Sequence, residues 1–161
     1  MLLYRAVRER REKGLDIDAL ARYVENIIQS QDHWFIVDDL NHLKRGGRVS
    51  GAAAFFGTML NIKPVLHVDD AGHLIPMEKV RGRKASLDAL VAHMEKDAVD
   101  PASQTVFISH GDCRADAEYV ADLVREKFGT QDIRIHSIGP VIGSHSGPGT
   151  VALFYLGRTR G

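Results

Sequence analysis

The residues best suited to hold a small polar ligand lie in one glycine-rich segment. Residues 138–149 read IGPVIGSHSGPG and hold four of the 15 glycines. Within the segment, His145 stands between Ser144 and Ser146. Glycine lets a backbone approach a ligand closely, and an imidazole donates or accepts hydrogen bonds near neutral pH. The segment follows an expected strand, where open α/β sheets bind their ligands, although a tight loop with a solvated histidine is the alternative interpretation.

A basic turn between an expected strand and an expected helix is the second candidate. Lys79, Arg81, Arg83 and Lys84 place four cations within six residues. Such a group can hold a carboxylate or a phosphate, because arginine binds these anions bidentately and a helix N-terminus adds partial positive charge. The alternative is a solvated basic turn.

Two further fragments could bind a metal ion, and each has a simpler explanation. The carboxylates of Asp38 and Asp39 precede His42, and oxygen ligands suit hard cations, but such residues commonly cap helices. His110 and Cys113 could belong to a metal or redox site, or to the start of the next helix. Because the other histidines show no ligand pair such as HExxH, we predict neither a metal nor a cofactor.

The segment 52–61, AAAFFGTMLN, is small and apolar. The default interpretation is a core helix, which Ser50 could cap. The alternative is one wall of a lipid pocket.

Composition limits the classes of partner. The 161 residues carry 21 basic and 21 acidic side chains, so the net charge is zero. A neutral chain argues against nucleic acid or an anionic membrane surface as the main partner. The single Cys113 cannot form an internal disulfide, which suits a cytoplasmic setting. No apolar run approaches the roughly 18 residues of a membrane span, so we expect no stable membrane insertion.

The elements that must position these residues alternate along the chain. Apolar spacing predicts helices at 2–13, from Asp16 to Ile28, at 84–97 and at 113–128, strands at 33–37, 105–109, 133–138 and 150–156, and a β-hairpin at about 62–80. We therefore predict one α/β domain with a mixed, partly parallel sheet flanked by helices. Pro64 predicts an edge strand or a bulge, and residues 138–149 are expected to form a loop.

Four segments carry a resemblance to a known family. They are LNHLKRGGRVS at 40–50, NIKPVL at 61–66, KVRGRK at 79–84 and IGPVIGSHSGPG at 138–149. In this order and spacing they resemble the DegV family of bacterial fatty-acid-binding proteins, and the match covers nearly the whole chain.

The resemblance implies a fold and a function. Members of the family have two α/β domains and hold one long-chain fatty acid between them, with the acyl chain in an apolar tunnel and the carboxylate on polar groups. A separate fatty-acid kinase then makes an acyl-phosphate for phospholipid synthesis. We therefore expect a lipid-binding protein without catalytic residues of its own, whose partners are a long-chain fatty acid and such a kinase.

The resemblance also suggests residue roles. By position, His145 is similar to the family's head-group histidine and Arg81 to its head-group arginine, with Arg83 as the alternative. Ser144 and Ser146 are expected to lie beside the ligand. A buried carboxylate needs a cation and directed hydrogen bonds, or it takes up a proton. The apolar tunnel is expected to be lined by Phe55, Phe56, Met59, Leu60 and Ile62.

The N-terminal domain of the family, with its serine- and threonine-rich head-group motif, has no match before residue 33. We therefore expect residues 1–31 to be a helical lead-in from that domain and residues 32–161 to form the DegV-like C-terminal α/β domain of a fragment or truncated form. Two other functions stay open. One is an interaction module that dimerises through the exposed domain interface, and the other is a small hydrolase that uses His145 with a metal at Asp38–Asp39.

Overall fold

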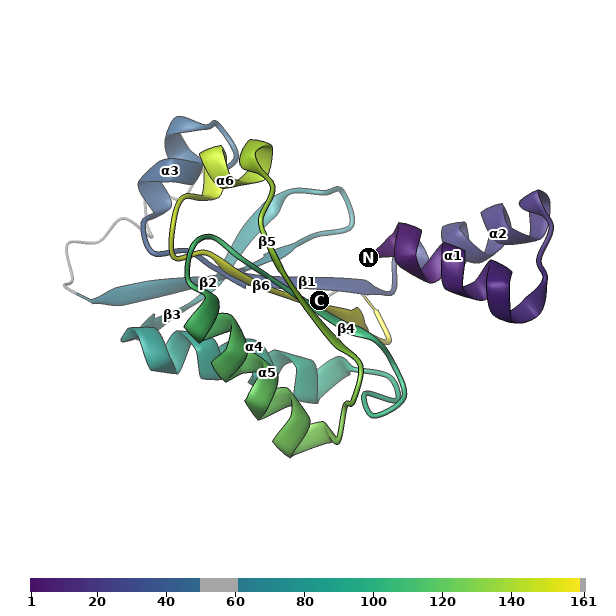
Figure 1. The fold of residues 1–161 in the computed structure, drawn as a ribbon. Helices are drawn as coiled ribbons and strands as arrows, with labels where there is room; N and C mark the ends of the chain where they lie inside the picture. Colours follow the sequence, from purple (N-terminus) through teal and green to yellow (C-terminus); the bar gives the residue numbers. More distant parts are fainter. Residues whose placement is uncertain (50–60, 160–161) are drawn as a thin grey trace.

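A computed structural model gives the structure of residues 1–49 and 61–159. Its strands are β1 (Gln31–Ile36), β2 (Ile62–Val68), β3 (Leu74–Arg81), β4 (Val106–His110), β5 (Ile133–Ser137) and β6 (Val151–Leu156). They form one sheet in the order β3-β2-β1-β6-β4-β5 (Figure 1). Only β4 and β5 run parallel, and every other neighbouring pair in this sheet is antiparallel.

The helices lie on both faces of this sheet. They are α1 (Leu2–Lys13), α2 (Ile17–Ile28), α3 (Leu40–Arg45), α4 (Arg83–Asp97), α5 (Arg114–Phe128) and α6 (Pro140–Ser146). Helices α4 and α5 cover one face, α3 and α6 lie over one end of the other face, and α1 and α2 project to the side (Figure 1). The predicted α/β class with a mixed sheet flanked by helices is therefore confirmed.

Local signals set the ends of the first two helices as the sequence predicts. Gly14 ends α1 in the left-handed region, at a φ of 65° that glycine adopts without strain. Asp16 caps α2, because its side chain accepts a hydrogen bond from the Ala19 amide at 2.7 Å.

The predicted hairpin is present, but Pro64 does not lie on an edge strand. Strands β2 and β3 pair from Ile62–Arg81 to Val68–Leu74, with a register shift between Val65 and Leu66. The bulge is thus confirmed, whereas β2 lies between β3 and β1. Pro64 is tolerated there because the pairing with β1 ends at Val65, so no ladder bond is required of its missing N–H.

The loop prediction for residues 138–149 is wrong in its middle, where α6 forms. Pro140 stands in the first turn of α6, where its fixed φ suits a helix and its missing N–H costs nothing. Gly147 ends the helix at a φ of 79°. The sequence did not predict this helix because glycines at both of its ends are typical of a loop and the helix has only two turns. The helix predicted for 51–60 lies outside the described residues.

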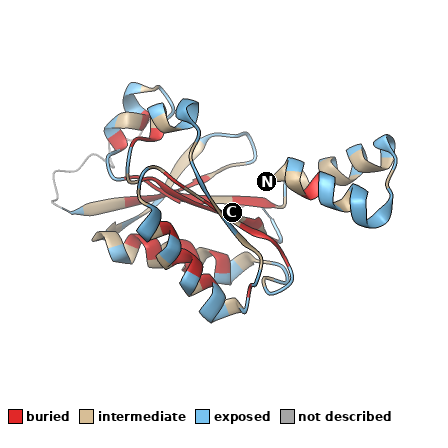
Figure 2. Ribbon diagram, viewed as in Figure 1, coloured by how far each residue is buried: buried red, intermediate tan, exposed pale blue. Residues whose placement is uncertain are grey.

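One face of the sheet is sealed by α4 and α5 (Figure 2). Alternate strand residues such as Ile36, Ile108 and Leu153 are fully buried there against Leu90 and Val120 of the two helices. Because a strand points successive side chains to opposite faces, the residues next to these in sequence point to the other face of the sheet. Trp34 stacks on the ring of His93 of α4 at 3.5 Å.

The described residues cover the other face at one end. There α3 and α6 lie over a smaller cluster that contains Phe35, Leu40, Leu43, Leu66 and Ala152. Between α6 and the turn of the β2–β3 hairpin, the described part of the chain leaves this face open, and the open region forms the site described below.

Helices α1 and α2 form an arm beside the sheet (Figures 1 and 2). Of their residues only Arg5 and Ala6 are buried. The Arg5 guanidinium donates to the Thr105 carbonyl at 2.8 Å, and Tyr4 packs edge-on against Phe107. These contacts join the arm to the beginning of β4.

Candidate functional site

A groove of about 740 Å³ lies on the open face of the sheet. Its described lining comes from all six strands of the sheet, from α3 and α6, and from the β2–β3 turn. The floor is apolar, with Phe35, Val68, Leu74, Ala152 and Phe154 facing the cavity.

Strand register explains why these residues share one floor. In the β1–β6 pair, Phe35 lies opposite Ala152 and His33 lies opposite Phe154. Partners across a ladder point to the same face, while the intervening Trp34 and Leu153 point to the sealed face. His33 and Phe154 meet edge to face, with ring centroids 5.4 Å apart.

The end of the groove beside α6 is polar. Ser109, Ser137, Ser146 and Thr150 line it. The Thr150 hydroxyl is tied to the carbonyls of Ser146 and Gly147, at 3.1 and 2.9 Å. In contrast, the hydroxyl of Ser146 is buried and has no hydrogen-bond partner among the described residues. A buried polar group normally has a partner, so this hydroxyl is suited to a polar atom of a ligand.

His145 also lies on this polar end. It occupies the last turn of α6, is half-buried and lines the groove next to Ser146. The structure therefore brings together two of the predicted ligand residues, His145 and Ser146. Ser144 points away, since it is exposed and donates its hydroxyl to the Val141 carbonyl at 2.8 Å.

The cation on the groove wall is Arg48, which the sequence analysis did not single out. It follows α3, lines the groove, and donates to the Gly46 carbonyl at 2.6 Å. The available signal was its place in LNHLKRGGRVS, beside two glycines that let the chain turn back toward α6. Spacing alone does not distinguish it from Lys44 and Arg45 of the same segment.

The two predicted arginines lie elsewhere. Arg81 is exposed at the end of strand β3, opposite Ile62, and neither residue is among the described residues that line the groove. Arg83 also lies outside that lining, because it joins Asp116 at 2.7 Å and Asp38 at 3.3 Å. Of the predicted tunnel residues, Phe55, Phe56, Met59 and Leu60 lie outside the described residues.

Arg83 belongs to a polar cluster, called the brace below, that also contains Asp38, Lys63, Cys113 and Asp116. The brace joins β2, α4 and α5. Asp38 accepts from Lys63 at 2.8 Å as well as from Arg83. Arg83 also reaches the Cys113 sulfur at 3.6 Å, and Cys113 in turn contacts the Thr150 carbonyl. Burial raises the pKa of the Cys113 thiol, and the positive charge of Arg83 opposes this effect. We therefore interpret the Cys113 thiol as a structural group, which links Arg83 to the Thr150 carbonyl.

The acidic pair and the His110–Cys113 fragment lie at the beginnings of helices α3 and α5. Asp39 caps α3 by accepting from the Asn41 amide at 2.8 Å. Cys113 occupies the N-cap position of α5 without a side-chain cap bond, and His110 is buried at the end of β4. Within residues 1–49 and 61–159, no three potential metal ligands of the His, Cys, Asp and Glu types lie together.

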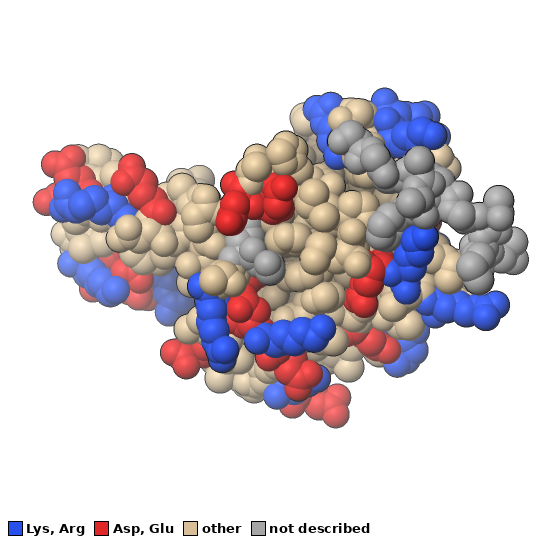
Figure 3. Space-filling view, turned by 180° about the vertical axis from the view of Figure 1, so that it is seen from behind, with Lys and Arg blue, Asp and Glu red and all other residues tan. Residues whose placement is uncertain are grey.

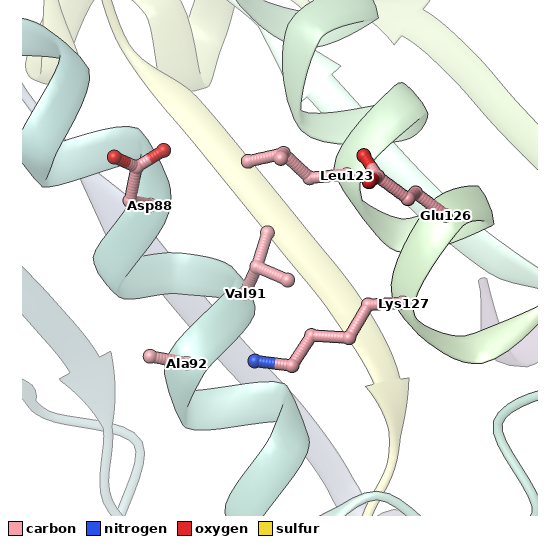
Figure 4. Close-up of a pocket in the computed structure, with 6 residues that line it drawn as sticks. All are labelled: Asp88, Val91, Ala92, Leu123, Glu126 and Lys127. Carbon is pink, nitrogen blue, oxygen red and sulfur yellow. The ribbon is translucent and has the colours of Figure 1, made fainter.

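A second cavity, of about 540 Å³, lies between α4 and α5 (Figure 4). Its described lining consists of Asp88, Val91 and Ala92 from α4 and Leu123, Glu126 and Lys127 from α5. Two of its polar groups are engaged, since Lys127 pairs with Glu95 and Asp88 accepts from Tyr119 at 2.6 Å. Carboxylates on both walls make it a poor site for an anionic ligand.

The groove on the open face has the opposite charge environment. Lys and Arg side chains gather over the end of the molecule that carries α3 (Figure 3). Lys44, Arg45 and Arg48 are exposed there. Cations at one end of an apolar cleft attract an anionic head group to that end. Separately, no helix in the described part of the chain combines the length and apolar character needed to cross a bilayer.

Comparison with known proteins gives one consistent result. A family model described as "Uncharacterised protein, DegV family" matches residues 1–158. A curated DegV domain-containing protein of Clostridium perfringens is 48% identical over 160 residues, which cover 99% of this chain and 55% of that protein. The chain thus spans about half the length of the curated relatives it matches.

Solved structures agree in fold. A DegV lipid binding protein from Thermotoga maritima is 30% identical with a TM-score of 0.83, covering 98% of this chain and 55% of that one. A fatty acid binding DegV family protein from Streptococcus agalactiae is 34% identical with a TM-score of 0.78, covering 96% of this chain and 54% of that one.

Proposed function

The chain belongs to the DegV family, and we propose that its groove forms one wall of a binding site for a long-chain fatty acid. The observation that carries this proposal is the polarity of the groove. An apolar floor runs toward a polar end, where His145 lies together with the Ser146 hydroxyl, which has no hydrogen-bond partner in the described part of the chain. A molecule with a long apolar chain and one polar head fits such a surface.

The size of the groove supports the proposal. Its volume of about 740 Å³ lies within the roughly 300–1,000 Å³ common for small-molecule sites. The two solved relatives above are described as lipid binding and fatty acid binding.

We propose that a second domain covers the open side, as the greater length of the relatives allows. Residues 1–31 would then be the helical connection to it, and 32–161 the domain described here.

The head group is proposed to lie at the α6 end. The Ser146 hydroxyl can donate to a carboxylate oxygen, the His145 ring supplies a second donor, and Arg48 supplies positive charge. Donors are required because an ionised carboxylate without partners is expensive to bury. Arg81 as a head-group cation, and Phe55, Phe56, Met59, Leu60 and Ile62 as tunnel residues, stay predictions from the sequence.

Native mass spectrometry tests this proposal. The chain is delipidated and incubated with oleate, both alone and together with the N-terminal part of the Clostridium perfringens relative. We expect one bound fatty acid per molecule. Replacing a donor to a charged group weakens binding by roughly tenfold or more, so His145→Ala should lower retention by about this factor. His136→Ala, an exposed histidine on β5, is the matched control. Retention of no fatty acid in either preparation would contradict the proposal.

We further propose that the bound fatty acid is delivered to a separate kinase, as the family resemblance implies. No catalytic residue is needed in this chain for that role. Incubation of the loaded protein with a fatty-acid kinase and ATP should yield acyl-phosphate, and none should form without the kinase. Product formed by this chain alone would favour an enzyme instead.

An interaction module is the second candidate, because α6 exposes apolar side chains where it lines the groove. Val141 and Ile142 are 73% and 63% exposed. Adjacent exposed apolar residues of this kind often mark an interface. A dimer in sedimentation velocity that Val141→Asp dissociates would support this candidate, whereas a monomer at all concentrations would argue against it.

A further inference from the structure

Helices α3 and α6 hold one another through two histidine–glycine contacts. Gly46, which ends α3, lies under the His145 ring of α6, and a Cβ on Gly46 would come within 3.2 Å of the His145 Cγ atom. Gly147, which ends α6, lies under the His42 ring of α3, and a Cβ there would come within 2.7 Å of the His42 Cγ atom. Each helix therefore supplies one ring and receives the other.

The two glycines are required for different reasons. Gly147 has a φ of 79°, a backbone conformation that residues with a side chain adopt only with strain. Gly46 has a φ of −75°, which any residue adopts. A side chain is therefore excluded at Gly46 by the His145 ring alone. The position of the His145 ring therefore depends on Gly46, a residue that makes no polar contact through a side chain.

The contacts rest on anchored elements. Helix α3 is capped by Asp39 and buries Leu40 and Leu43 under the open face. The His42 ring lies beside the Arg45 guanidinium, with 3.3 Å between Nδ1 and Nη2. Movement of α3 would consequently move both rings.

The segment after α6 is held as firmly. The Gly149 amide donates to the Gly111 carbonyl at 2.7 Å, and the Gly111 amide donates to the Thr150 carbonyl at 2.8 Å. The Asp38 carboxylate, which pairs with Lys63 and Arg83, leaves no room for a Cβ on Gly149. The His145 ring is therefore located between a fixed C-terminal anchor and the α3 surface.

We propose that Gly46 and His42 are positioning residues for His145, holding its ring at the polar end of the groove where a fatty-acid carboxylate is bound. The inference rests on the proposed function for the identity of the ligand. The proposal also explains part of the segment LNHLKRGGRVS, because Gly46, the first glycine of RGG, leaves room for the His145 ring. Gly47 does not share this role, because nothing lies within 4 Å of the place a Cβ would take.

The test compares Gly46→Ala with Gly143→Ala. Gly143 lies within α6 and is not among the described residues that line the groove, and the nearest atom to a Cβ there would be the Ile138 Cγ2 atom at 3.9 Å, an ordinary van der Waals contact. The full chain is labelled with ¹³C-histidine, and the His145 Cε1–Hε1 signal is assigned by its loss in His145→Ala. Oleate affinity is measured on the same variants, in the preparation that binds oleate best.

We expect Gly46→Ala to shift the His145 signal and to weaken oleate binding about tenfold, while Gly143→Ala changes neither. In the His145→Ala background, Gly46→Ala should cost no further affinity, because the ring it displaces is gone. His42→Ala removes atoms and so introduces no clash, and it takes the place of Gly46→Ala in the test if that variant does not fold. We expect His42→Ala to shift the His145 signal as well.

The two proposals fail separately. If the wild type binds oleate and the variants at Gly46 and His42 match Gly143→Ala in both measurements, the positioning role is overturned and fatty-acid binding stands. If the wild type binds no fatty acid while Gly46→Ala still shifts the His145 signal, the placement of the ring is supported and the proposed function is overturned.

Discussion

The two faces of the sheet are built from the same strands but are closed to very different extents. Counting only residues 1–49 and 61–159, 16 buried residues on the α4–α5 face form one cluster that includes both helices. On the α3–α6 face, seven of these described residues form a buried cluster at one end, and a groove of about 740 Å³ lies beside it. Burial of apolar surface is the main stabilising contribution to folding. The sealed face therefore supplies most of the stability, and the open face keeps apolar surface available for a ligand.

The difference shows how one strand can serve both purposes. In β6, Leu153 is fully buried on the sealed face, while its neighbour Phe154 packs at the margin of the smaller cluster and faces the groove. Substitutions one residue apart should then separate stability from binding.

The largest expected effect is that of Leu153→Ala. Removal of a fully buried leucine should lower the free energy of unfolding by about 2–5 kcal/mol, measured in urea, and leave the oleate affinity of the folded protein unchanged. Phe154→Ala should cost less than half as much although phenylalanine is larger, and should weaken oleate binding. An equal loss of stability in the two variants would show that the open face belongs to the core as fully as the sealed one.

A smaller effect is expected from the brace. Arg83→Met leaves Asp116 and Asp38 without their guanidinium partner, so the free energy of unfolding should fall by about 1–2 kcal/mol. Oleate affinity should stay within about twofold of the wild type, because Arg83 lies outside the described lining of the groove.

Arg81→Met is the matched comparison for the brace. The side chain is exposed at the end of β3, so little stability should be lost. A loss of oleate affinity in Arg81→Met would support its predicted head-group role. The same loss in Arg83→Met would instead favour Arg83 as the head-group arginine.

The sealed face should also be sensitive to acid. Burial lowers the pKa of His93, and the hydrogen bond to Glu78 at 3.0 Å opposes this effect. The unfolded chain then takes up a proton at a higher pH than the folded one, so the free energy of unfolding should fall as the pH drops below about 6.5. In His93→Gln the decline between pH 7 and 5 should be shallower. His136→Gln, with its exposed side chain, should keep the wild-type slope, and identical slopes in all three proteins would contradict the assignment.

The smallest effect on stability is expected at Ser146. Ser146→Ala removes a buried hydroxyl without a described partner, so the free energy of unfolding should change by less than about 1 kcal/mol. Oleate binding should nevertheless weaken, because the carboxylate loses a donor. A large loss of stability with unchanged oleate binding would mean that the hydroxyl serves the fold.

Much of the fold could be predicted from short segments. Asp16 and Gly14 mark helix ends through contacts within a few residues, and alternation over 62–68 and 74–80 marks the hairpin. Helix α6 was missed because Gly139, Gly143 and Gly147 are typical of a loop. Its formation depends on contacts with α3, which is about one hundred residues away in the chain.

The candidate site divides in the same way. The sequence by itself determined the strands, most of the helices and the family resemblance, and it singled out His145 and Ser146 as candidate ligand residues, because these depend on local pattern and motif. The tertiary structure decided that β6 lies between β1 and β4, that Arg83 is occupied by Asp116 and Asp38, and that Arg48 stands on the groove wall. The physical reason is that a cation's role depends on which carboxylates and cavities lie beside it. Those neighbours are brought together by strand order and helix packing rather than by spacing along the chain.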